Sequence, residues 1–245
     1  MHDGRPLIKN GSWLMDMVGR IVLLHRTLRR YLFYPILLSS LLSISIYLGR
    51  VVLSRNWVVY RNLSWNLFLA WLPYLFCLVA VWLHNRHPRR WWLIGLPAML
   101  WLIFFPNAPY LITDFLHLEE RPYIPLWYDI ILLASFAWTG IFLGITSLWI
   151  MQGIVKSYTG QLISWFFVML AIGLSGLGVY LGRFSRWNSW DMLIQPKIIM
   201  AEVVSKMSDP FNNLRFLGFT VLFVAFFAVS YLMFVSMYHA KDGDR

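Results

Sequence analysis

The sequence predicts an all-α fold, a polytopic membrane helix bundle with about six transmembrane helices, and three observations predict it. Of the 245 residues, 59% are hydrophobic and only 13% are charged, whereas soluble domains carry roughly 25% charged residues. The apolar residues gather in runs, each near the ~20 residues that an α-helix needs to cross a bilayer. Aromatic residues crowd the ends of these runs, as they do in the aromatic belts of membrane proteins.

Taken in order, the chain divides into one membrane domain with short additions. We expect a single transmembrane helical domain over residues 31–240, preceded by segment 1–30 and followed by a tail over 241–245. The expected spans cover about residues 31–49, 63–83, 91–112, 126–150, 161–182 and 216–238. Serines dilute the first of these runs, which makes it the least apolar.

Two amphipathic segments are predicted outside the spans. From Ser12 to Arg30, apolar residues at helical spacing face an arginine-rich side, which is typical of a helix in the membrane interface. A solvated tail is the alternative. In the last loop, Pro196 suits the first turn of a helix that ends before Asp209.

Six crossings place both termini on one side of the membrane. Lysine and arginine are slightly more numerous on that side, chiefly in the N-terminal segment and loop 84–90, which predicts cytoplasmic termini. The net charge of +10 is spread in short clusters between apolar runs. This pattern suits topology signals and anionic lipid head groups, and no folded basic domain is present to bind nucleic acid. The expected partners are the lipid bilayer, its anionic lipids and a second membrane protein.

The third run contains two prolines close to its end, within Phe105-Pro106-Asn107-Ala108-Pro109-Tyr110. We expect them to push Phe105 and Ala108 toward extended geometry. The backbone carbonyls released there need a protein or water partner, because lipid offers none. Broken helices at this depth often line a binding cavity. The alternative is a kinked helix end with Asn107 as its cap.

The densest cluster of titratable residues follows: Asp114, His117, Glu119 and Glu120. If this stretch is helical, Asp114, His117 and Glu120 could face one way, and a carboxylate and an imidazole could share a proton. Asp114 and His117 are therefore the candidate catalytic residues, with solvated interfacial acids as the alternative. The sequence has no HExxH or CxxC pattern, and it predicts no metal site and no cofactor.

A second polar cluster runs from Arg183 to Asp191. Two arginines could hold a phosphate or a carboxylate while tryptophan packs against a lipid or a ring; a positive flank with an aromatic belt is the alternative. Two spans separate the clusters, so both reach one membrane face. The candidate binding residues on that face are Asn107, Glu120, Asp129, Arg183, Arg186, Trp187, Asn188 and Asp191. Asp129 is either interfacial or paired with Arg50, Arg183 or Arg186.

Small residues recur at a spacing that permits close helix contact. Gly140 and Gly144 lie four apart in the fourth run, and Gly178 and Gly182 do so in the fifth. This small-xxx-small spacing lets the backbones of neighbouring helices approach. The alternative is that glycine is simply common in membrane helices.

Residues 102–118 read LIFFPNAPYLITDFLHL, and residues 180–191 read YLGRFSRWNSWD. These two stretches resemble the signatures of a bacterial family catalogued as domain of unknown function 1361. The likeness covers roughly residues 60–240. It implies a multi-pass protein of the bacterial cytoplasmic (inner) membrane, and it supplies no reaction, because the family has none assigned.

Three classes of function remain, and the sequence leaves open whether the protein is an enzyme. The favoured one is a non-catalytic membrane component with a polar site on its extracytoplasmic face. A membrane-embedded enzyme acting on a lipid or envelope precursor could use Asp114 or His117 as base and Arg183 or Arg186 as anion clamp. A small-solute transporter would need ionisable groups deep within its spans, where this chain has few.

Overall fold

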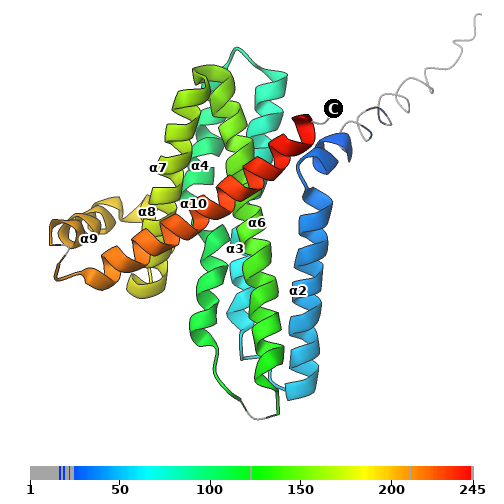
Figure 1. Cartoon of the computed structure of the whole chain (residues 1–245), viewed down its shortest axis with the longest axis vertical. Helices are drawn as coiled ribbons and strands as arrows, with labels where there is room; N and C mark the ends of the chain where they lie inside the picture. Colours follow the sequence, from blue (N-terminus) through cyan, green and yellow to red (C-terminus); the bar gives the residue numbers. More distant parts are fainter. Residues whose placement is uncertain are drawn as a thin grey trace, which may run out of the picture.

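The computed structural model is a bundle of helices (Figure 1). It describes residues 25–121, 123–209 and 211–243, the isolated residues 17, 19 and 22, and side chains as far as residue 238. Within these residues there is no β-strand, only one isolated bridge between Arg121 and Ile124. The amphipathic helix expected from Ser12 lies largely outside the described residues, as do residues 244–245 of the expected tail.

Long helices alternate with short helical turns along the chain. In order, they are α2 (Phe33–Ser54), α3 (Arg61–Arg86), η1 (Trp91–Ile94), α4 (Gly95–Phe104), α5 (Asn107–Tyr110), η2 (Leu111–His117), α6 (Leu126–Thr159), α7 (Gln161–Tyr180), η3 (Leu181–Ser185), α8 (Asp191–Ile194), α9 (Pro196–Ser208) and α10 (Leu214–Gly243). Both η1 and η2 are 3₁₀ helices, whereas η3 is a π-helix. The second expected amphipathic helix is confirmed as α9, which begins at Pro196 and ends before Asp209.

Six segments are long and apolar enough to cross a membrane, which confirms the predicted bundle. They are Phe33–Ser54, Arg61–Arg86, Trp91–His117, Leu126–Thr159, Gln161–Ser185 and Leu214–Tyr238. Large apolar side chains on their outer faces, such as Leu38, Leu170 and Leu222, are exposed. An apolar surface of this extent suits lipid rather than water. The chain is a multi-pass membrane protein.

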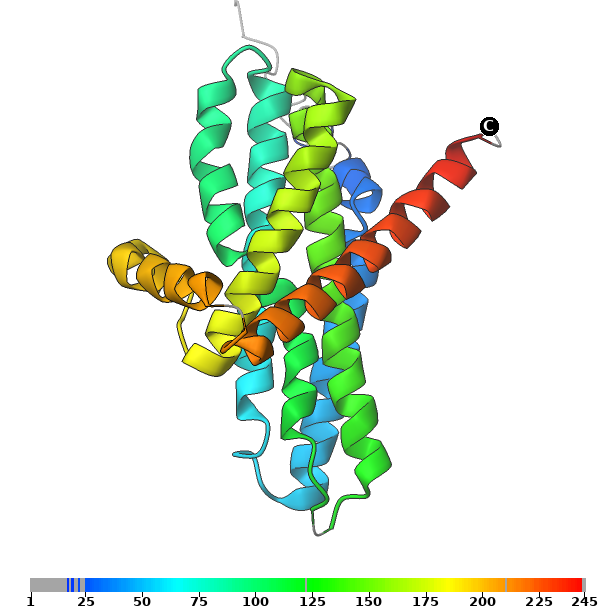
Figure 2. The ribbon, with the colours of Figure 1, turned by 60° about the vertical axis from the view of Figure 1, so that its left-hand side comes forward.

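Helix α6 forms the centre of the bundle. In its most apolar stretch 61% of the residues are buried, against 22–39% in the other spans. Figures 1 and 2 show α2, α3, η2 and α7 running along α6, while α10 crosses the bundle obliquely. The α3–η1 and α6–α7 loops lie at one end of the bundle, and the α2–α3 and η2–α6 loops at the other. Helix α9 projects sideways at the level where α7 ends (Figure 2).

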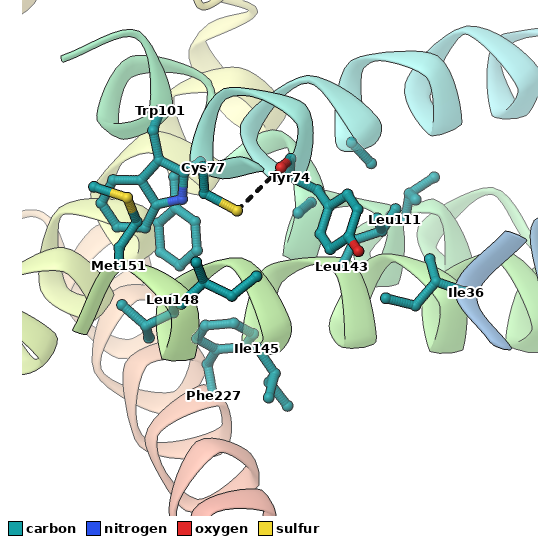
Figure 3. Packing of buried hydrophobic residues seen from close by; sticks show 14 of the residues in the cluster. Ile36, Tyr74, Cys77, Trp101, Leu111, Leu143, Ile145, Leu148, Met151 and Phe227 are labelled. Atoms are coloured by element: carbon teal, nitrogen blue, oxygen red, sulfur yellow. Dashed lines mark hydrogen bonds between the residues drawn. The ribbon is translucent and has the colours of Figure 1, made fainter. Parts of the chain in front are cut away.

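The core lies where α3, α4 and α10 meet α6. Figure 3 shows Trp101 of α4, Met151 of α6 and Phe227 of α10 gathered there. Cys77, the only cysteine of the chain, is buried, and its thiol donates to the carbonyl of Tyr74 at 3.0 Å. Large aromatic side chains fill this region of the core. The cavity described below lies elsewhere in the bundle.

The two prolines bend the third span without unwinding it. Phe105 has φ −54° and ψ −39°, and Ala108 lies within α5, so the expectation of extended geometry at these residues is wrong. The amide of Ala108 donates to the carbonyl of Phe105 at 3.2 Å, and that of Tyr110 donates to Pro106 at 3.1 Å. These bonds carry the helical path across both prolines, and the chain continues as the tighter 3₁₀ helix η2.

The proline corner, residues 106–111, is held between two glycine-bearing helix faces. A Cβ added to Gly140 of α6 would lie 2.3 Å from the carbonyl oxygen of Ala108, and one added to Gly178 of α7 would lie 2.6 Å from Cγ of Pro106. Cβ atoms added to Gly144 and Gly182 would also touch the corner, 3.4 Å from Pro109 and 3.3 Å from Tyr110. The close approach predicted from the glycine spacing is confirmed, and its partner is the corner itself.

Candidate functional site

A buried ion pair joins the two polar clusters that the sequence singled out. Nη1 of Arg183, on η3, lies 3.3 Å from Oδ1 of Asp114, on η2, and the two side chains are only 9% and 6% exposed. Nδ2 of Asn66 on α3 donates to Oδ2 of Asp114 at 3.1 Å. The guanidinium of Arg183 also reaches the hydroxyl of Tyr110 at 3.5 Å. Asp114 is thus paired with one cation and one amide, as a buried charge requires.

Beside this pair lies the main cavity, with a volume of about 550 Å³. It is bounded by α3, by the chain from α4 to α5, by α7 and η3, and by residues 186–203. Apolar residues from four helices form most of its wall: Leu69, Leu102, Ile103, Leu174, Leu177 and Val203. Polar side chains line the rest: Asn66, Asn107, Tyr110, Arg186, Asn188 and Ser189. The cavity therefore has a long apolar part and a polar end.

The polar end is built where the proline corner meets residues 186–189. Nδ2 of Asn107 donates to Oγ of Ser189 at 2.8 Å. No side-chain hydrogen bond caps α5, so Asn107 lines the cavity and does not serve as a cap. Arg186 closes the π-helix η3 with φ 61°, a left-handed conformation that costs a non-glycine residue roughly 1 kcal/mol. This turn directs the following residues back toward Asn107.

Helix α9 supplies one wall and is fastened by Glu202. Its carboxylate accepts from Oγ of Ser185 at 2.5 Å and from Nε1 of Trp187 at 2.6 Å, and it lies 3.0 Å from Nζ of Lys206. Burial would raise the pKa of the Glu202 carboxyl, but these hydrogen bonds and the charge of Lys206 outweigh it and hold that pKa below its usual value. Ile199, one turn earlier, is buried against the bundle.

A second buried ion pair lies outside the cavity. Nε and Nη2 of Arg50 donate to the two carboxylate oxygens of Asp129 at 2.6 and 3.1 Å, and both side chains are almost fully buried. Cζ of Arg50 also lies 5.0 Å from the ring centre of Tyr60. Of the alternatives for Asp129, the structure shows inward pairing, with Arg50 as the partner. Asp129 belongs to the α2–α6 contact and not to the cavity.

The other candidate residues fall into three groups. Asn107, Arg186, Trp187 and Asn188 line one cavity. Asp191 accepts hydrogen bonds from the backbone and side chain of Asn188, at 2.7 and 3.3 Å, and so holds the turn. His117 and Glu120 are exposed, and no hydrogen bond joins either to Asp114 in the part of the chain that the structure describes. The expected shared face of Asp114, His117 and Glu120 does not form, because the helix ends at His117 and Leu118 is extended.

Sequence reasoning missed three residues that complete the site: Asn66, Tyr110 and Glu202. A signal existed for Asn66, a bare amide inside a predicted span, and for Glu202, the only acid between Met192 and Ser208. Their partners, however, come from other helices. Within the described residues, no group of three or more His, Cys, Asp or Glu side chains gathers that could hold a metal ion.

Comparison with known proteins assigns the chain to a family but not to an activity. No curated protein matches the chain, and no solved structure does. The family described as "Protein of unknown function (DUF1361)" matches residues 65–238. The matched residues include the proline corner, Arg183 of η3 and Arg186, which follows η3. Helix α2, with Arg50, precedes the matched region. Since the match spans well over half of the chain, this membrane protein belongs to the DUF1361 family.

Proposed function

We propose that this protein is a non-catalytic membrane component that binds an amphiphilic molecule, a lipid or a lipid-linked precursor, in the main cavity. The observation that carries the proposal is the cavity itself, which joins a long apolar wall to a compact polar end. Its volume of about 550 Å³ falls within the roughly 300–1,000 Å³ of small-molecule sites. A ligand with an apolar chain and a small polar head would match both parts.

The direction of the cavity supports a lipid-like ligand. Its polar lining lies at the end of α7, whereas Leu177 and Leu174 lie earlier along that helix. At 1.5 Å a residue, Leu174 is about 16 Å from Ser185, close to half of the ~30 Å hydrocarbon core. The apolar wall thus extends over about one leaflet, with the polar end toward one membrane surface. The slight excess of lysine and arginine at the opposite side favours the extracytoplasmic surface for the polar end.

The residues that line the cavity favour binding over catalysis. Those that the structure describes include no carboxylate, imidazole or thiol, and a general base must lie within hydrogen-bond reach of the proton it removes. Asp114 is held behind the cavity by Arg183 and Asn66. His117 is exposed and does not line the cavity. The candidate base and the candidate ligand site are therefore separate, which weakens the alternative of an enzyme.

Filling the cavity tests this function. Leu177→Trp places a large ring in the apolar wall, while Leu170→Trp puts the same ring two turns earlier on α7, at a side chain that is 51% exposed and outside the cavity. After purification in mild detergent, mass spectrometry of the intact protein counts the retained lipid. We expect Leu177→Trp to lose most of the lipid and Leu170→Trp to keep it. Equal retention by both variants, with normal folding, would overturn the proposal.

A further inference from the structure

Among the residues that the structure describes, Arg186 is the only charged side chain that lines the main cavity. No hydrogen bond or ion pair joins its guanidinium to any other residue that the structure describes. Its charged neighbours are compensated: Arg183 by Asp114, and Glu202 by Lys206. Asp191, which does not line the cavity, accepts two N–H groups of Asn188. In the described part of the chain, Arg186 is therefore the one positive charge lining the polar end that has no partner.

The residues around Arg186 add hydrogen-bond donors. Ser189 accepts from Asn107, so its own hydroxyl hydrogen remains available, since it is donated to no described residue. The amides of Asn107 and Asn188 also line the polar end. Behind them, Nη2 of Arg183 is buried and has no hydrogen-bond partner among the described residues. A planar guanidinium with hydroxyl and amide donors close by matches the several acceptor oxygens of a phosphate.

We infer that the head of the cavity ligand is an anionic phosphate group and that Arg186 is its counter-charge. This inference rests on the proposed function, because it names the chemistry of the ligand held in the same cavity. It also separates the two arginines of the second polar cluster. Arg183 orders the site through Asp114 and Tyr110, whereas Arg186 contacts the ligand. A guanidinium that holds no other described partner can form a charge-assisted, bidentate contact with an anionic head and not with an uncharged one.

The test compares ligands that share their acyl chains and differ only in the head. Phosphatidate carries the phosphate, diacylglycerol lacks it, and inorganic phosphate supplies the anion without the chains. Binding to the full-length protein in detergent is measured by titration with mass spectrometry. We expect phosphatidate to bind roughly tenfold or more tightly than diacylglycerol, with inorganic phosphate displacing it only at much higher concentration.

Matched variants test whether Arg186 is the residue that binds the phosphate group. Arg186→Gln should weaken phosphatidate binding roughly tenfold and leave diacylglycerol binding unchanged. Arg55→Gln is the control, because Arg55 is also exposed and also left-handed, with φ 51°, yet does not line the cavity. It should change neither affinity. Arg186→Lys retains the charge without the planar pair of donors, so we expect an intermediate loss, which distinguishes ligand binding from a folding defect.

The failing outcomes separate the two proposals. If the unaltered protein binds phosphatidate and diacylglycerol equally well, the phosphate inference is overturned and the amphiphile-binding function stands. Equal losses in Arg186→Gln and Arg55→Gln would also overturn the inference. If the protein binds neither lipid, the proposed function itself is overturned. Displacement by inorganic phosphate at the concentration of phosphatidate would identify a free anion as the ligand, and would overturn the lipid-linked head.

Discussion

Gly140→Ala gives the sharpest test of how the proline corner is held. The added methyl carbon would lie 2.3 Å from the carbonyl oxygen of Ala108 and 2.8 Å from Cδ1 of Leu111. Ordinary contacts of this kind begin near 3.4 Å, so α6 and the corner would have to separate by about 1 Å. The nearest obstacle is a backbone oxygen, which cannot rotate away as the end of a side chain does.

The expected cost follows from two opposing effects. Overpacking of this kind costs about 1–3 kcal/mol, while alanine favours a helix over glycine by up to about 1 kcal/mol. We expect Gly140→Ala to reduce the free energy of unfolding by about 1–2 kcal/mol. Gly153→Ala is the control on the same helix, since a Cβ there has no neighbour within 4 Å. It should be neutral or stabilising.

Reversible unfolding in mixed detergent micelles, followed by circular dichroism, measures both variants against the unaltered protein. Lipid retention provides a second reading, because displacing the corner moves Asn107 at the polar end of the cavity. Gly140→Ala should lower both quantities, and Gly153→Ala neither. Equal stability of the two variants would show that the corner is not clamped between α6 and α7 as described, and would refute the reasoning.

Three further predictions concern other contacts. Asp129→Asn leaves Arg50 buried without its counter-charge, so we expect a loss of about 3–5 kcal/mol in detergent unfolding; a loss below about 1 kcal/mol would contradict the buried pair. Gly178→Ala would meet the ring of Pro106 at 2.6 Å and should cost about 1–3 kcal/mol in the same assay; unchanged stability would contradict this contact. Since the folded pKa of Glu202 is depressed, its fastening of α9 should be complete above the usual Glu pKa of about 4.3 and lost as pH falls through the lower folded pKa. The protection factors of the α9 amides, which correct for the slower intrinsic exchange in acid, should therefore fall on acidification, and Glu202→Gln should show the lower protection already at pH 7; protection factors insensitive to both changes would refute the role of Glu202.

At the proline corner, packing between helices outweighs the backbone preference of the residues that precede each proline. Residues before a proline prefer extended geometry, and that preference predicted the wrong conformation for Phe105 and Ala108. In the structure, the helical corner packs closely against Gly140 and Gly178, where an added Cβ would lie 2.3 Å from Ala108 and 2.6 Å from Pro106. Local preferences of this size are readily outweighed by packing between helices.

The polar site was predicted in part, for a reason that topology explains. An even number of crossings between two segments returns the chain to the same membrane face, so the nearness of Asn107 and residues 186–188 was open to inference. The separate roles of the residues within that site could not be inferred from the sequence. Asp114 and Arg183 compensate one another at 3.3 Å, while Arg186 has no ion-pair partner among the described residues. Nothing in the order of residues distinguishes the two arginines.

By itself, the sequence determined that the chain is a six-span membrane bundle with an amphipathic helix in its last loop, because hydrophobic length and periodicity are properties of each segment alone. Only the tertiary structure decided that Asn66 donates a hydrogen bond to Asp114, that Asp129 pairs with Arg50, and that His117 is exposed. These outcomes depend on how distant helices rotate and approach one another. Small residues such as Gly140 and Gly178 set that approach through contacts across the bundle, which no single segment encodes.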